Sequence, residues 1–112
     1  MKKITLTCAH AIVKYLIAQK ILINGKKEPL FPGVFGIFGH GNVACLGQAL
    51  EESKKELPTY RGHHEQNMAL TGIGYARAKR RQQIFVATSS VGPGATNMVT
   101  AAAVAMSNRL PI

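Results

Sequence analysis

The chain has 112 residues, 46% of them hydrophobic, which suffices for one small domain with a modest core. Its 14 lysines and arginines outnumber 5 acidic residues and give a formal net charge of +9, which permits nucleic-acid or phosphate partners. No apolar run approaches the roughly 20 residues needed to span a bilayer, and the first residues lack the apolar stretch and cleavage site of a signal peptide.

Neither the cations nor the cysteines indicate a specific site. The basic clusters fall at a chain end, in a turn or at the end of an expected helix, where solvated cations are ordinary and favour the helix dipole. These clusters are Lys2-Lys3, Lys26-Lys27, Lys54-Lys55 and Lys79-Arg80-Arg81. Cys8 and Cys45 lie far apart in apolar surroundings, without the Cys or His spacing of a zinc or redox site. We therefore expect two buried free thiols in a reducing cytoplasm.

Residues 5–32 predict a helix followed by a loop. Thr5 or Thr7 can cap the helix, in which apolar side chains at positions 12, 13, 16 and 17 repeat at helical spacing. Residues 21–32 interrupt this pattern with lysines, prolines and glycine, and we expect them to form a loop.

A buried strand and a second helix are expected next. Residues 33–38, GVFGIF, form a short apolar run that ends in Gly39-His40-Gly41-Asn42, the pattern of a parallel strand entering a Gly-rich turn. A helix is expected over residues 43–56, because Pro58 ends it. Residues 59–61 are long enough only for a minor strand.

The second half of the chain predicts helix, strand and helix. Residues 64–81 form an Ala-rich helical pattern with a basic last turn, and residues 84–88, IFVAT, predict a buried strand. A turn over residues 89–94 leads into a helix over residues 95–108, whose alanines permit close packing on a sheet or on another subunit. The alternation predicts an α/β fold in which helices flank a parallel sheet with right-handed connections.

In parallel α/β sheets, ligands gather outside the carboxyl ends of the strands. Three segments are expected there, namely residues 38–42, His64-Glu65 and residues 89–97. Glu65 is the one acid at a helix start inside this crevice, although its position alone also fits a glutamate that interacts with the helix dipole. The adjacent histidines lack the H-E-x-x-H spacing, so we expect no metal bound by this chain.

The order of motifs in the second half resembles a known superfamily. His64-Glu65-Gln66 precedes a helix containing GYAR, an apolar strand follows, and GPGATN at residues 92–97 opens a small-residue helix. From Gly33 onward the chain closely resembles the pyrimidine-binding domain of thiamine diphosphate-dependent enzymes of the acetohydroxyacid synthase type. Within that superfamily, FGHGN at residues 38–42 is most similar to the trihydroxycyclohexane-1,2-dione hydrolases of myo-inositol catabolism, which open a cyclic diketone to 5-deoxyglucuronate.

The resemblance implies roles for five residues. Glu65 would be the catalytic residue and would hydrogen-bond the pyrimidine N1′ of the cofactor. Gly39, which lacks a Cβ, and Pro93 would let the backbone approach the cofactor, although Gly-Pro-Gly also suits a tight turn before a helix. Asn97 would contact the cofactor or cap a helix. His40 would face the substrate or be a polar turn residue.

The resemblance also implies that part of the active site lies elsewhere. In the superfamily, Mg²⁺ and the diphosphate are held by a separate domain with a Gly-Asp-Gly motif, and this chain has no aspartate. Residues 1–112 would form the N-terminal part of the pyrimidine-binding domain of a longer chain. That chain would act on a small cyclic polyol diketone as a homodimer or tetramer, and the 112-residue piece alone would be inactive.

Two alternatives remain open. Another thiamine diphosphate-dependent lyase or ligase, such as an acetohydroxyacid synthase-like enzyme, predicts flavin binding or activity on pyruvate. A basic nucleic-acid-binding module would explain the charge, but it leaves Glu65 and GPGATN unexplained and offers few aromatic side chains for stacking.

Overall fold

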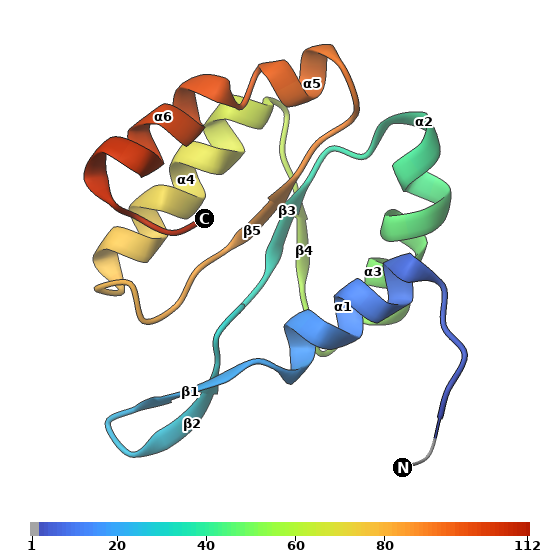
Figure 1. Ribbon diagram of the computed structural model, residues 1–112, viewed down its shortest axis with the longest axis horizontal. Coiled ribbons are helices and arrows are strands. Elements are labelled where there is room, and N and C mark those ends of the chain that lie inside the picture. Colours follow the sequence, from blue (N-terminus) through green and yellow to red (C-terminus); the bar gives the residue numbers. More distant parts are fainter. Residues whose placement is uncertain (1–2) are drawn as a thin grey trace.

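Three short parallel strands form the centre of the computed structural model, which describes residues 3–112 (Figure 1). They are β3 (Val34–Gly36), β4 (Thr59–Arg61) and β5 (Val86–Thr88), in the order β4-β3-β5. Phe35 of β3 is in register with Tyr60 on one side and with Ala87 on the other. The expected parallel sheet is confirmed, and the minor strand at residues 59–61 is one of its edges.

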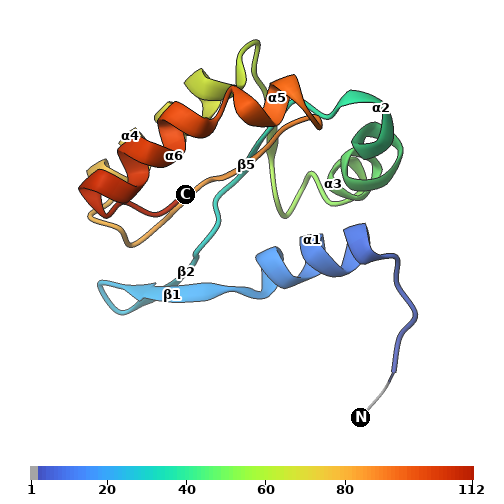
Figure 2. The same cartoon turned by 45° about the horizontal axis from the view of Figure 1, so that its top comes forward.

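Helices cover both faces of this sheet, as Figures 1 and 2 show. On one face lie α1 (Cys8–Ala18) and α3 (Gln48–Glu52), and on the other lie α4 (Glu65–Ala78) and α6 (Val99–Asn108). The buried side chains form one cluster on each face. The first consists of Val13, Val34, Ala49, Leu50 and Leu57, and the second of Ala69, Ile73, Ala101 and Ala105. The predicted layers of an α/β fold are therefore present.

Thr7 is the N-cap of α1, because its side chain accepts a hydrogen bond from the backbone N–H of His10. Of the two candidate caps, the structure selects Thr7. Val13 of the expected apolar stripe is buried, and Leu16 and Ile17 pack against the same cluster. Ile12 is 47% exposed, so it lies at the edge of the stripe.

The loop expected at residues 21–32 is wrong, because a β-hairpin occupies most of this segment. Strands β1 (Lys20–Ile23) and β2 (Lys26–Pro29) pair antiparallel around Asn24-Gly25. Both turn residues have positive φ, 50° at Asn24 and 77° at Gly25. A two-residue hairpin turn with positive φ at both positions is the turn that Asn-Gly favours. That dipeptide was the signal in the sequence, and the surrounding lysines and prolines obscured it.

The Gly-rich turn expected at residues 39–42 is also wrong, since the chain becomes helical there. Helix α2 (Gly39–Asn42) begins after β3 with only residues 37 and 38 between them, and it continues through a π-helical turn, η1 (Val43–Gly47), into α3. Gly39 has a φ of 69°, which a residue without a Cβ adopts readily, so the chain can turn sharply into the helix at this residue. The regular helix ends at Glu52 rather than at residue 56.

The remaining elements match their predicted types with changed bounds. Helix α4 and strand β5 lie inside the expected segments, and Lys79 is the C-cap of α4. The last helix is divided, because α5 (Pro93–Thr96) stops at Asn97 and α6 begins at Val99. In residues 3–112, no helix is long and apolar enough to cross a membrane.

The prediction of buried cysteines is wrong, because Cys8 and Cys45 are both exposed free thiols. Cys8 is the first residue of α1, and Cys45 lies in η1. Adjacent residues on a helix point in different directions. The apolar neighbours of the two cysteines can therefore face the core while the cysteines face solvent.

Truncating Leu57 tests the core between α1, α3 and the sheet. Leu57 is fully buried, so Leu57→Ala should lower the free energy of unfolding by about 2–5 kcal/mol. Leu22 in the hairpin is 70% exposed, and Leu22→Ala should change it by less than about 0.5 kcal/mol. Urea unfolding followed by circular dichroism measures both, and equal effects would contradict the placement of the core.

Candidate functional site

The three segments expected at the carboxyl ends of the strands do meet there. The side-chain amide of Asn42 in α2 donates to the backbone oxygen of Ser89, 3.2 Å away, which joins the segments after β3 and β5. A Cβ built on Gly39 would lie only 2.6 Å from Cβ of Ser90, so the two segments touch through the missing side chain. The third segment, at the start of α4, is joined to them by Glu65.

Glu65 is the first residue of α4 and is partly buried. The side-chain amide of Asn97 donates to Oε2 of Glu65 at 3.0 Å, across 32 positions of sequence. This hydrogen bond, together with one from the Glu65 backbone N–H and the nearby His64, lowers the pKa of the Glu65 carboxyl below its ordinary value, against a smaller effect of burial. Glu65 is therefore held ionised and is fixed in direction by a neutral donor.

Gly94 makes room for this carboxylate. A Cβ built on Gly94 would lie 2.9 Å from Oε1 of Glu65 and would overlap the Ser90 hydroxyl. Gly94 is buried, and it follows Pro93, the first residue of α5, and Gly92, whose φ of 65° turns the chain. The Gly-Pro-Gly turn thus starts a helix and also leaves the Glu65 carboxylate beside backbone that carries no side chain.

His40 lies in a neighbouring hollow rather than beside Glu65. The hollow of about 370 Å³ is lined by residues of α2 and the segment after β5. These are Phe38, Gly39, His40, Gly41, Asn42, Ser90 and Val91. Ser90 connects the two places, because it touches Gly39 on one side and Gly94 on the other. His40 is exposed on the first turn of α2, so its side chain is accessible to a ligand in this hollow.

Pro93 and Asn97 line a more open surface with Gly92 and Thr96. Asn97 is also the C-cap of α5, and its backbone N–H bonds the oxygens of Pro93 and Ala95. Among the residues expected at the site, the structure thus brings Glu65 and Asn97 into direct contact, places Pro93 on the same short helix, and sets Gly39 and His40 across Ser90.

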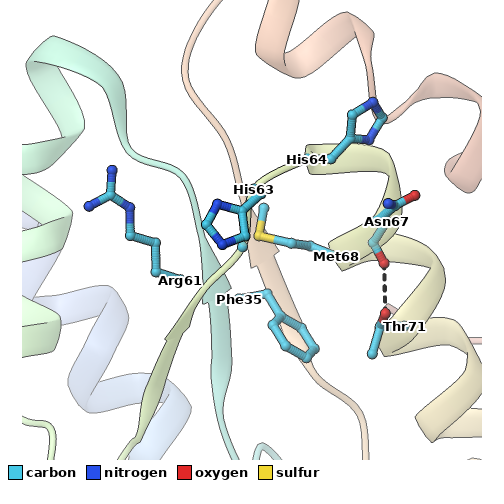
Figure 3. A pocket seen from close by; sticks show the side chains of 8 residues that line it. Phe35, Arg61, His63, His64, Asn67, Met68 and Thr71 are labelled. Atoms are coloured by element: carbon cyan, nitrogen blue, oxygen red, sulfur yellow. Dashed lines mark hydrogen bonds between the residues drawn. The ribbon is translucent and has the colours of Figure 1, made fainter.

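A second hollow, of about 280 Å³, lies at the start of α4 and was not predicted from the sequence (Figure 3). Phe35 and Met68 supply apolar side chains, and Arg61, His63, His64 and Asn67 supply polar ones. In Figure 3, His63 lies next to Met68 while Arg61 stands apart from both histidines. His64 also contacts Asn97, with 3.3 Å between Nε2 and Nδ2. The only indication of this hollow in the sequence was the position of His64 immediately before Glu65.

Comparison with known proteins adds an independent finding. Residues 27–112 match the model of the thiamine pyrophosphate enzyme family, N-terminal TPP binding domain. All 112 residues align with a 3D-(3,5/4)-trihydroxycyclohexane-1,2-dione hydrolase from Geobacillus thermodenitrificans at 54% identity, and with proteins of the same name from Clostridium tetani at 49% and Bacillus thuringiensis at 48%. The chain spans 18% of the length of the first relative and 17% of the other two.

Acidification tests the lowered pKa of the Glu65 carboxyl. Because the pKa of Glu65 is lowered in the fold, its contribution to stability is complete above its ordinary value of 4.5 and is lost as the pH falls through the lowered value. Glu65→Gln should therefore lose less stability than the wild type below pH 4.5, measured as the thermal unfolding midpoint. Glu56→Gln, at an exposed position after α3, should retain the acid sensitivity of the wild type. Identical acid curves for Glu65→Gln and the wild type would contradict the lowered pKa of Glu65.

Proposed function

This chain belongs to the thiamine pyrophosphate enzymes through their N-terminal cofactor-binding domain, and we propose that it forms the N-terminal part of the pyrimidine-binding domain of a ring-opening hydrolase. The substrate would be trihydroxycyclohexane-1,2-dione, and the product 5-deoxyglucuronate. The observation that carries the proposal is the ionised Glu65 beside the Gly92-Pro93-Gly94 turn, in a chain 54% identical to a protein named for that hydrolysis.

The chemistry of the site suits the pyrimidine ring of thiamine diphosphate. A flat ring needs backbone without side chains, and Gly94 and Gly39 supply such backbone beside Glu65 and Ser90. A ring nitrogen needs a partner that shares a proton, and the Glu65 carboxylate lies next to Gly94. When bound, the cofactor supplies the nucleophilic carbon for cleaving a bond next to a carbonyl.

Each residue of the site would have a distinct task. Glu65 would hold a proton shared with the ring nitrogen N1′, and its lowered pKa favours the proton on the ring. Gly39 and Pro93 would let backbone approach the cofactor, and Asn97 would contribute to its binding. His40, in the hollow joined to the site through Ser90, would donate a hydrogen bond to an oxygen of the diketone or accept its proton.

The rest of the active site would come from other parts of a longer protein. Mg²⁺ and the diphosphate would be bound by a domain with aspartate ligands, since this chain contains no aspartate. That domain would belong to a partner subunit of a homodimer or tetramer, which requires the 112-residue piece to be inactive by itself. The same proposal places the longer protein in the cytoplasm.

Replacing Glu65 tests the catalytic assignment. The full-length protein with thiamine diphosphate and Mg²⁺ should open trihydroxycyclohexane-1,2-dione, and Glu65→Gln should lower kcat by roughly 10²–10⁴-fold, the usual contribution of a positioned proton-transfer group. Glu56→Gln should keep the wild-type rate, because Glu56 is an exposed carboxylate on the α3 side of the sheet.

Product formation is measured by chromatography. Turnover of pyruvate but not of the diketone would favour an acetohydroxyacid synthase-like lyase instead. An undiminished Glu65→Gln enzyme would remove Glu65 from the mechanism.

Gly94 offers a test of cofactor binding. Gly94→Ala places a methyl group against Glu65 and Ser90, so it should weaken the affinity for thiamine diphosphate by about tenfold or more, the scale of one disturbed hydrogen bond to a charged group. Gly74→Ala in the exposed part of α4 is the matched control, since nothing lies within 4 Å of the added Cβ. Isothermal titration with saturating Mg²⁺ compares the two, and equal affinities would contradict the proposed position of the ring.

A further inference from the structure

The side-chain amide of Asn97 lies between two acceptors. Its nitrogen is 3.0 Å from Oε2 of Glu65 and 3.3 Å from Nε2 of His64. Glu65 and His64 are adjacent at the start of α4, whereas Asn97 ends α5, so one amide joins the two helices. The link also fixes the Gly-Pro-Gly turn to the catalytic carboxylate, because the Asn97 backbone N–H bonds to the oxygen of Pro93.

The two hydrogen atoms of the Asn97 amide determine which protonation state of His64 this contact requires. A primary amide has two N–H bonds, and an ionised carboxylate only accepts. One hydrogen of Asn97 satisfies Glu65, and the other is directed to His64 Nε2. Nε2 can accept it only when that nitrogen carries no proton, which requires neutral His64 with its hydrogen on Nδ1.

We propose that Asn97 is a positioning residue that clamps Glu65, with neutral His64 as its second anchor, so that protonation of His64 opens the clamp. The inference rests on the proposed function, since it concerns the direction in which Glu65 meets the cofactor. It changes the role of Asn97 from a cofactor contact to a residue that acts through Glu65.

Protonation of His64 would place an N–H against the amide N–H of Asn97. Two donors repel each other, so the amide turns away and Glu65 loses its strongest partner. The remaining attraction between a charged His64 and Glu65 is the smallest of the effects on the Glu65 carboxyl, whereas the Asn97 hydrogen bond is the largest. Protonation of His64 should therefore change the direction of the Glu65 carboxylate without protonating it.

The charged and titratable groups around His64 are few. Glu65 follows it on α4, His63 precedes it, and Arg61 at the end of β4 lines the same hollow. Arg61 is permanently charged, which leaves His63 as the neighbour whose titration must be separated from that of His64.

Variants at positions 64 and 97 test the clamp in the full-length protein. Isothermal titration with thiamine diphosphate and saturating Mg²⁺ at pH 7.5 and pH 5.5 measures the affinity. Asn97→Ala should weaken binding by roughly tenfold at pH 7.5, the scale of one lost hydrogen bond to a charged group. His64→Ala, which removes the acceptor, should weaken binding less but in the same direction.

His64→Gln is the decisive variant, because a glutamine oxygen accepts the amide hydrogen and does not titrate. It should bind like the wild type at pH 7.5 and more tightly than the wild type at pH 5.5. His63→Gln should keep the wild-type dependence on pH. A merely structural role of His64 would not be rescued by glutamine and would not change the pH profile.

Two results would overturn the inference and are distinguishable from failure of the proposed function. If Glu65→Gln weakens cofactor binding while Asn97→Ala and His64→Ala bind like the wild type, the clamp is wrong and the function stands. If His64→Gln follows the wild-type pH profile, His64 is not the switch. If the wild type does not bind thiamine diphosphate, the proposed function itself fails.

Discussion

The close approach of Ser90 to Gly39 and Gly94 is the constraint on which the site depends. Ser90 follows β5, and its side chain fills the space that a Cβ would occupy on both glycines. The segment after β3 and the start of α5 can therefore meet at one point above the sheet. A side chain at either glycine would separate His40 and its hollow from Glu65, because Ser90 is the residue that touches both sides. Two missing side chains thus create the contact between the surroundings of Glu65 and the hollow beside His40.

The sheet beneath this contact is small, since each of its strands has three residues. Backbone pairing over such short lengths stabilises little, and most of the stability must come from the helices that bury Val34, Leu50 and Leu57 on one face and Ala69, Ile73 and Ala101 on the other. The alanines of α6 let it pack closely on α4 (Figure 1). That packing sets the position of α5, and hence of Asn97 relative to Glu65.

Local sequence patterns predicted the elements that bury an apolar run or an apolar stripe, and they predicted Glu65 as the acid above the sheet. They failed where a single residue sets the backbone. Asn24-Gly25 forms the turn of a hairpin within a charged segment, and Gly39 starts a helix shortly after β3 where a Gly-rich turn was expected. The hydrogen bond between Glu65 and Asn97 was also beyond the sequence, because two residues 32 positions apart meet only after α4, β5 and α5 have packed.

The neutral partner of Glu65 suits the proton sharing that is proposed for this carboxylate. A lysine or arginine beside the carboxylate would lower its pKa further and would compete with a ring nitrogen for the same oxygens. Within residues 3–112, the ion pairs involve Glu51 and Glu52 and leave Glu65 to the amide of Asn97, although the chain carries a net charge of +9. An amide directs the carboxylate through one oxygen without adding a charge. Glu65 therefore stays ionised, fixed in direction and still able to share a proton.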